Sequence, residues 1–575
     1  MRIRHKDRRI NGVLRNRKNK NSRFKIGGRF WGNDKNWKGN DMMRNWAAGL
    51  VLVMVLGAGC ANQNAGKTNA GGSYEELLGV FKEFRELQKP VMVNGVPDYT
   101  AKAMTKQRRQ LKELRKRLEA IDTKGWLITK QADFELVRAE FNGLEFNHSV
   151  LRPWARDPGF YSVFERFEQT QANAIKMPTM PIPKEQIEKF AEHIRAVPAL
   201  LAQAKGNLKE ACSDLAMIAE RRKGREERMM QRLIDGLQKD HPELAGDAQK
   251  ALLAIEDFRK WLGQNKRNMK AEAGIGVKNY NRLLKEVYLF PYTWQECMDI
   301  AEREYERCVA DLKLEEHRNR NLAALEAATT AEEWTKRFID SQQFLADFLR
   351  TNHIMSEPDY LQMRTYTLRE PPKEKLDFFQ NVQVRDPLPL MPHDFVGHSQ
   401  DEARIKDNKN PIRKDYNLFH ISGIRAEALA TGSEEMLMHL GMLDERPRSR
   451  ELVYMLRIFR AVRAMADLKM HNGELNFKEA TEFCSRKVPY GWVVPDSNLI
   501  WEDLELYIRQ PGYGMGYLVG AVDMEKLLAE RAMQLGEDFT IQRFMGEFLS
   551  SGLAPLSLIR WEMTGNCEEI KKLRR

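Results

Sequence analysis

Apolar residues recur at three- and four-residue spacing along most of the chain from Tyr74 onward, the periodicity of an amphipathic α-helix. The clearest examples are the segments 73–88, 106–122, 184–237 and 294–328. The first of these opens on a serine followed within a turn by two acidic residues, which is typical of a helix N-terminus. The pattern therefore predicts a mainly α-helical protein.

Period-two alternation, which indicates β-strands, is clear only in two short segments, 360–368 and 382–392. Six prolines lie between residues 356 and 392, so this part of the chain reads as structured loop and strand rather than helix. We therefore expect one small β-sheet, placed next to the helix that begins where this region ends.

The first part of the chain has a different pattern. A 13-residue apolar run, Trp46–Ala58, follows a basic segment and is too short to span a bilayer as a helix. A short apolar run behind basic residues is typical of a secretory signal. Met42 or Met43 gives a conventional start for such a signal, so we expect residues 1–41 to be a basic leader ahead of the true start codon.

The end of this run is similar to the cleavage site of bacterial lipoproteins, because Gly59 and Cys60 are followed by Ala-Asn-Gln-Asn. We expect a signal peptide over 42–60, a lipid on Cys60 and a flexible tether over 61–73, which is rich in Gly and Asn. The chain would then be exported and lipid-anchored in the bacterial cell envelope. The alternative is a plain signal peptide, since the leucine before Cys60 stands one position further away than usual.

The net charge of +12 belongs to the leader alone. Residues 1–44 contain 15 Lys+Arg and 3 Asp+Glu, so the remainder has 78 basic and 78 acidic residues. A neutral body gives no electrostatic reason to expect a nucleic-acid partner. Beyond Cys60, five cysteines remain and none forms a C-x-x-C pair, so we predict neither a disulfide framework nor a cysteine metal site.

The stretch PHDFVGHSQDE contains two histidines five positions apart, His393 and His398, with Asp394 directly after the first. In the H-E-x-x-H pattern of zinc peptidases the histidines are four apart, about 40° around a helix, and both reach one ion. Five residues correspond to about 140°, so these two can share a metal only through a π-type bulge, which Gly397 would ease. The alternative is two histidines in a polar loop.

The segment RAEALATGSEEMLMHLGML, residues 425–443, resembles the E-G-W-A-L-Y-A-E-E segment of a large bacterial family catalogued as domain of unknown function 885. Further stretches agree with the motifs of that family in order and spacing: 152–161, 276–312, 463–483 and 507–527. The resemblance runs from about residue 75 to the end of the chain.

That family is placed, by resemblance, among gluzincin-type zinc metallopeptidases with a large, mainly helical zincin-like fold. The resemblance implies one zinc ion per chain, held by His393, His398 and Glu427. It also divides the body into an N-terminal helical region, 74–280, and a zinc-peptidase-like catalytic region, 281–575.

The resemblance further implies catalytic roles. Asp394 stands at the position of the general base, and His471 and Tyr517 stand where the family keeps side chains that could hydrogen-bond a developing oxyanion. Each assignment has an alternative: His471 could cap a helix C-terminus, and Tyr517 could belong to the core. Asp401 or Glu402, three and four residues after His398, could replace a ligand, and Glu427 could be a solvated acid.

The implied function is an exported, metal-dependent hydrolase, a zinc peptidase acting on short peptides. The main alternative is a pseudoenzyme that serves as a membrane-anchored helical binding or scaffold protein. Three departures from the family motif favour it: the Asp394 base, the loss of one residue together with the proline, and Ser399 in place of a final histidine. A third hypothesis is a hydrolase that acts on a non-peptide amide or on an ester.

Overall fold

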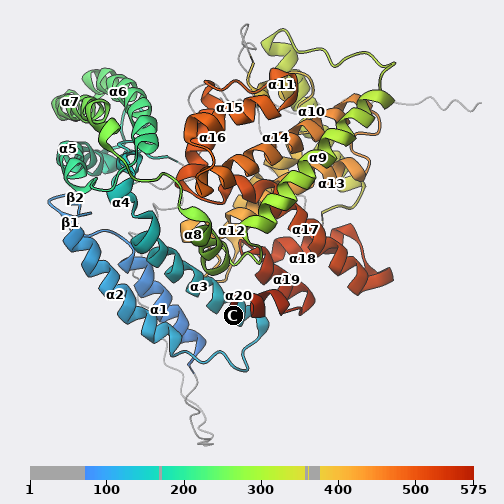
Figure 1. Ribbon diagram of the computed structural model, residues 1–575, viewed down its shortest axis with the longest axis horizontal. Coiled ribbons are helices and arrows are strands. Elements are labelled where there is room, and N and C mark those ends of the chain that lie inside the picture. Colours follow the sequence, from blue (N-terminus) through green and yellow to red (C-terminus); the bar gives the residue numbers. More distant parts are fainter. Residues whose placement is uncertain (1–71, 167–170, 356–360, 362–375, 575) are drawn as a thin grey trace, which may run out of the picture.

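The computed structural model describes residues 72–166, 171–355, 361 and 376–574, and it is mainly α-helical (Figure 1). The signal segment 42–60 and the lipidation residue Cys60 lie outside the described residues. None of the described helices is both long enough and apolar enough to span a membrane. The five cysteines of the body are free thiols.

The first half of the fold contains a small hairpin and a series of long helices. In chain order the elements are α1 (Tyr74–Leu87), β1 (Met92–Val93), β2 (Val96–Pro97), α2 (Ala101–Glu119), α3 (Ile128–Phe146), the π-helix η2 (Asn147–Leu151), α4 (Pro153–Arg156), the 3-10 helix η3 (Pro158–Tyr161), α5 (Lys184–Asn207), α6 (Ser213–Asp240), α7 (Pro242–Asn265), the 3-10 helix η4 (Lys266–Asn268), α8 (Gly276–Arg282) and the π-helix η5 (Leu283–Val287).

The second half is also helical. Its elements are α9 (Trp294–Arg318), α10 (Ala331–Thr351), α11 (Phe378–Gln383), the π-helix η7 (His393–Ser399), α12 (Gln400–Asp407), the 3-10 helix η8 (Leu418–His420), α13 (Gly423–His439), α14 (Pro447–Asn472), α15 (Phe477–Lys487), the 3-10 helix η9 (Pro489–Gly491), α16 (Asn498–Arg509), α17 (Tyr513–Leu535), the 3-10 helix η10 (Gly536–Asp538), α18 (Ile541–Ser550), α19 (Leu556–Thr564) and α20 (Glu568–Arg574).

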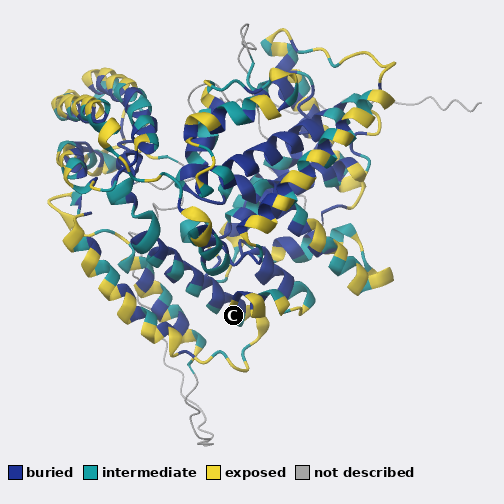
Figure 2. Ribbon diagram, in the orientation of Figure 1, coloured by how far each residue is buried: buried dark blue, intermediate teal, exposed yellow. Residues whose placement is uncertain are grey.

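Two hydrophobic cores hold these helices together. The larger core extends from Leu77 to Leu573, so α1 and α3 share it with the helices of the second half. The smaller core lies mainly within the bundle of α5, α6 and α7. Figure 2 shows the buried residues concentrated around α14, with exposed residues on the outer faces. All residues of both cores therefore lie between positions 77 and 573.

Helix α14 is the centre of the larger core and packs against α9, α17, α15 and α16. A helix surrounded on all sides is expected to be apolar all round, yet α14 carries three fully buried arginines, Arg457, Arg460 and Arg463. Their three-residue spacing keeps them close to one face of the helix. Buried charges require charged or polar partners, and the carboxylates that pair with these arginines are those of Glu435, Glu434 and Asp503.

Among the described residues, the small sheet lies elsewhere than the sequence pattern predicts. It is the antiparallel hairpin of β1 and β2, in which Val93 pairs with Val96 around an Asn-Gly turn. The predicted strand at 382–392 is wrong: this segment holds the end of α11, which a capping box at Asp377 begins, and then a turn in which Asp386 accepts a hydrogen bond from the Leu388 amide. The other predicted strand, 360–368, lies outside the described residues except for Leu361.

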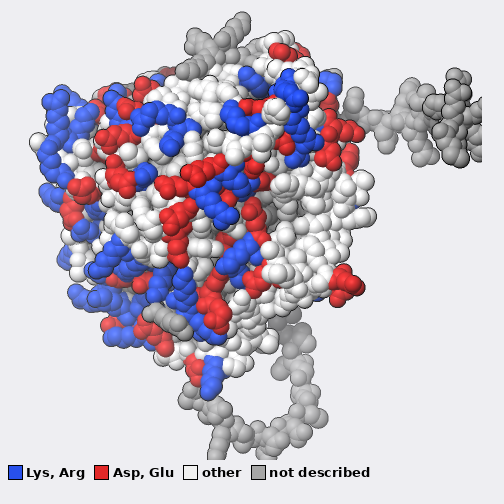
Figure 3. All heavy atoms as spheres, turned by 45° about the vertical axis from the view of Figure 1, so that its right-hand side comes forward, with Lys and Arg blue, Asp and Glu red and all other residues white. Residues whose placement is uncertain are grey.

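The charges of the body are mixed rather than segregated. On the face drawn in Figure 3, basic and acidic side chains are interspersed. Many of them form ion pairs between neighbouring helices, such as Arg195 with Asp247 and Arg531 with Glu547. This arrangement agrees with the zero net charge counted for the sequence beyond residue 44.

Candidate metal centre

The two histidines lie at the ends of a π-helix, η7, rather than of a regular α-helix. In a π-helix the hydrogen bonds run from residue i to residue i+5, so His393 and His398 come onto the same side of the chain. The π-type turn expected from the five-residue spacing is therefore confirmed. Gly397 lies inside this turn, as expected, but its main role is packing against α13.

That packing explains why residue 397 is a glycine. A Cβ atom at this position would lie 2.3 Å from the Cα of Ala430 and 2.4 Å from its Cβ. Both contacts are far shorter than van der Waals separation, so only glycine lets η7 approach α13 this closely. The approach brings the two histidines within reach of Glu427, one turn before Ala430 on α13.

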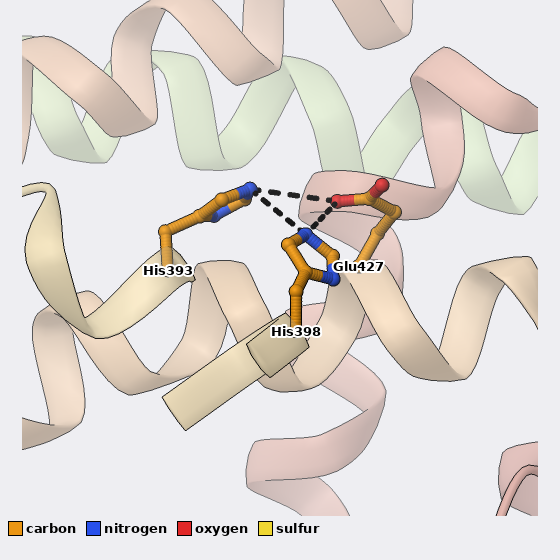
Figure 4. A group of neighbouring side chains, drawn as sticks. All are labelled: His393, His398 and Glu427. Carbon is orange, nitrogen blue, oxygen red and sulfur yellow. Dashed lines mark hydrogen bonds and ion pairs between the residues drawn. The ribbon is translucent and has the colours of Figure 1, made fainter. Parts of the chain in front are cut away.

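Three ligand atoms converge between η7 and α13 (Figure 4). Nε2 of His398 lies 3.3 Å from Nε2 of His393. Oε2 of Glu427 lies 3.7 Å from Nε2 of His393 and 3.6 Å from Nε2 of His398. Ligands of a tetrahedral zinc ion with bonds of 2.0–2.2 Å lie roughly 3.3–3.6 Å apart. The triangle therefore has the dimensions that a zinc ion requires.

The chemistry of this donor set also fits a metal. Oε1 of Glu427 accepts a hydrogen bond of 2.7 Å from the Tyr513 hydroxyl, whereas Oε2 is buried and accepts no hydrogen bond. A buried carboxylate oxygen without a hydrogen bond is costly unless a cation compensates it. Burial raises the pKa of Glu427, but His398, His393 and Tyr513 together lower that pKa to about 2. The carboxylate is thus ionised, as a metal ligand must be.

The two imidazoles differ in their electrostatic surroundings. Burial lowers the pKa of His393 well below its usual value, and the nearby Arg460 lowers it further. His393 is therefore neutral, the form that binds metal ions. Burial also acts against the charged form of His398, but Glu427 and Asp394 outweigh it and raise the pKa of His398. The side chains of His393 and His398 remain 13% and 19% exposed, which leaves one side of the cluster accessible.

A second carboxylate contacts His393 on the Nδ1 side of its ring. Oε1 of Glu434 lies 3.2 Å from Nδ1 of His393, and Nη2 of Arg460 donates a 2.5 Å hydrogen bond to the same oxygen. Such a carboxylate fixes the ring orientation and leaves Nε2 free to bind a metal. Burial raises the pKa of Glu434 to about 7, against the effect of Arg460. Sequence reasoning missed this contact, although Glu434 follows Glu427 by seven residues, two helical turns on the same face.

The other predicted site residues are distributed as follows. Asp394 lies in η7, close enough to His398 to raise its pKa. The ring of Tyr517 stacks on His393 with a centroid distance of 6.2 Å and an interplanar angle of 18°. The guanidinium of Arg463 lies 4.6 Å from the centre of the Tyr517 ring. Tyr517 is therefore part of the wall of the cluster.

His471 lies outside the cluster. It follows Arg460 by eleven residues on α14, about 16 Å along the helix axis. Its ring is almost completely buried, and its Nε2 lies 3.1 Å from the carbonyl oxygen of Tyr507. Its other neighbours are Asp467, one turn away, and the ring of Tyr280. These contacts place His471 in the structural core, and the contacts around His393 do not include it.

Asp401, which the sequence offers as an alternative metal ligand, lies outside the cluster as well. It forms an ion pair with Arg425, which is fully buried on α13. This pair ties α12 to α13 just beyond His398. Among the described residues, His393, His398 and Glu427 are the one group of three or more His, Cys, Asp or Glu side chains whose ligand atoms converge in this way.

Comparison with known proteins identifies the family. A family model described as "Bacterial protein of unknown function (DUF885)" matches residues 85–359 and 430–563. The matched ranges cover most of the chain and leave out 360–429, which holds the three converging side chains. No curated protein matches the chain.

Two solved structures share the fold. One is a "putative lipoprotein of unknown function" from Shewanella oneidensis, with a TM-score of 0.66 and 13% identity; the match covers 86% of this chain and 100% of that one. The other carries the same kind of description and comes from Colwellia psychrerythraea, with a TM-score of 0.58, 11% identity, and 86% and 97% of the two chains covered. The sequence resemblance is thus confirmed at the level of the family: this chain belongs to the bacterial DUF885 family of unknown function.

Proposed function

We propose that this protein is an exported, metal-dependent hydrolase that binds one zinc ion and cleaves peptide bonds in short substrates. The observation that carries the proposal is the convergence of Nε2 of His393, Nε2 of His398 and Oε2 of Glu427, a buried oxygen that accepts no hydrogen bond. Two histidines and one carboxylate are a ligand set of catalytic zinc sites, which keep one coordination position open. The accessible side of the cluster corresponds to that open position.

A bound zinc ion would polarise the scissile carbonyl and lower the pKa of water to near neutrality. The protein groups would supply the remaining functions. Asp394 would accept the proton of the attacking water, and the partly exposed Tyr517, and Tyr513 beside it, would face the carbonyl oxygen of the substrate. Glu434 and Arg460 would keep the His393 ring in the orientation that binds metal.

The cell-envelope location is part of the same proposal. The signal-like segment ends in Gly-Cys, and the two proteins of the same fold are described as lipoproteins. Cys60 would carry the lipid, and firm attachment would use more than one acyl chain. Residues 281–575, which contain η7, α13, α14 and α17, would be the catalytic region.

The second candidate function is a pseudoenzyme that binds a metal or a ligand without turnover. It is favoured by Asp394, whose side chain is one methylene shorter than the usual glutamate. A carboxylate displaced by about 1 Å from its productive position can lower a rate about a hundredfold. In this reading the cluster stabilises the junction of η7 and α13.

Metal analysis tests the proposal directly. The chain from residue 61 to 575 contains both hydrophobic cores and lacks only the leader and signal. We expect it to purify with, or take up, about one zinc ion per chain and to cleave members of a mixed peptide library. Zinc uptake without any cleavage would favour the pseudoenzyme. Failure to bind any divalent transition metal would refute both metal-based readings.

A further inference from the structure

The outer edge of the N-terminal helices exposes apolar side chains at both ends. The hairpin between α1 and α2 carries three consecutive exposed apolar residues, Val91 (58%), Met92 (48%) and Val93 (50%). At the opposite end of α2, the loop into α3 exposes Leu127 (72%). Single exposed apolar residues are common, but three in a row along one arm of a hairpin are costly in water and indicate a contact surface.

The helix between these two ends is basic on its exposed side. Five exposed cationic residues recur there at three- and four-residue spacing: Lys102, Lys106, Arg109, Lys112 and Lys116. Lys116 pairs with Glu113, but within the described part of the chain the other four have no acidic partner. The segment Val91–Val93, these five residues and Leu127 together are called the α2 edge below. Figure 1 shows the hairpin, α2 and the following loop along one outer border of the molecule.

The chain enters the fold beside this edge. A Cβ atom on Gly72 would touch the backbone of Ile121, in the loop after α2. The ring of Tyr74 contacts that of Trp126 in the same loop, with centroids 5.8 Å apart. Eleven residues, 61–71, lie between Cys60 and Gly72, so these two residues are at most about 43 Å apart along an extended chain. A lipid on Cys60 would therefore hold the α2 edge close to a bilayer.

We propose that the α2 edge docks on the surface of an anionic lipid bilayer. The side chains of Val91–Val93 and Leu127 would enter the boundary between headgroups and acyl chains, where apolar side chains gain by leaving water. The cations of α2 would lie over the anionic headgroups, and each of them strengthens the attraction. A binding surface of this kind is separate from the metal centre, which lies on η7 and α13, so either assignment stands without the other.

Vesicle co-sedimentation of the unlipidated chain 61–575 tests this surface, because the covalent anchor is then absent. The probes are vesicles of phosphatidylcholine with and without phosphatidylglycerol. We expect binding at least about tenfold stronger to the anionic vesicles, falling steeply with added salt because the Debye length shortens. Reversing three charges (Lys102→Glu, Lys106→Glu, Arg109→Glu) should weaken binding about tenfold or more, and Met92→Ser with Val93→Ser should weaken it at every salt concentration.

A matched control has the same charge change on exposed residues of the α6–α7 bundle: Lys239→Glu, Lys250→Glu and Lys260→Glu. We expect this control to bind nearly as the parent chain does. The proposal is overturned if the parent chain binds neither kind of vesicle, a result that would favour a protein partner for the α2 edge. It is also overturned if the control variant loses as much vesicle affinity as the α2 variant. Unchanged zinc content and thermal unfolding would show that the α2 edge variants are folded.

Discussion

Glu434 contacts His393 from the side of the imidazole opposite to Glu427. Its Oε1 lies 3.2 Å from Nδ1, while Oε2 of Glu427 lies 3.7 Å from Nε2. One face of α13 thus supplies both a metal-side carboxylate and the carboxylate that orients the ring. This arrangement makes the roles of the two glutamates separable by experiment.

Replacing Glu427 with glutamine should remove most of the metal affinity. The amide oxygen can still accept the Tyr513 hydrogen bond, so the fold loses little, but the negative charge between the two histidines is gone. We expect zinc affinity to fall by more than about a hundredfold, beyond the 10- to 100-fold that outer-shell changes cause. Competition with a chromophoric chelator measures it, and unchanged affinity would remove Glu427 from the ligand set.

Replacing Glu434 with glutamine should have a milder effect on the same measurement. The side chain keeps its size, but His393 and Arg460 lose the anion that both contact. We expect zinc affinity to fall about 10- to 100-fold, the range observed for residues that orient a ligand. A fall as large as that of Glu427→Gln would indicate that Glu434 is itself a ligand.

The role of Asp394 is tested with the metal in place. If this side chain accepts the proton of the attacking water, Asp394→Asn should lower peptidase activity by at least about tenfold, the low end of what a positioned base contributes. Zinc content should stay unchanged, because Asp394 is not one of the three converging groups. Full activity in the Asn variant would exclude Asp394 as the base.

The close approach of η7 to α13 predicts a strong effect of one methyl group. Gly397→Ala places a Cβ 2.3 Å from Ala430 and must push the two elements apart, which should cost about 1–3 kcal/mol of unfolding free energy and weaken zinc binding. Gly79→Ala in α1 is the control, since nothing lies within 4 Å of its Cβ position. That helix should instead gain about 0.5–1 kcal/mol. Equal thermal stability of the two variants would contradict the packing argument.

The buried Asp467 predicts a pH dependence of stability. It accepts hydrogen bonds from the amides of Gly512 and Met515, and burial raises its pKa from 3.8 to about 7 against these bonds. Between these values the folded state holds a proton that the unfolded state has lost, so the free energy of unfolding should fall as the pH rises from about 4 to 7. Asp467→Asn should flatten this part of the profile, measured by urea unfolding at each pH. An unchanged slope would show that Asp467 is ionised in the folded state.

Some features of the protein follow from local sequence alone. The 3.6-residue periodicity predicts the helices, because a helix that buries one face repeats its apolar positions within each turn. The five-residue spacing of His393 and His398 predicts the π-type turn, since both rings could share an ion in no regular helix. Five motifs in the right order were enough to identify the family. Each of these signals lies within one continuous segment of the chain or in the order of such segments.

Other features depend on contacts between distant segments. The partner that Arg460 finds in His393 is 67 positions away, and the hydrogen bond from Tyr513 to Glu427 spans 86. The same applies to His471, whose place in the core depends on where α14 packs against α16. The prediction of a strand at 382–392 is wrong for a related reason. Alternating apolar residues fit a buried turn as well as a strand, and the prolines of this segment lack the backbone N–H groups that a sheet requires. Local pattern sets which elements form, whereas the packing of α13, α14 and α17 around η7 decides which side chains meet.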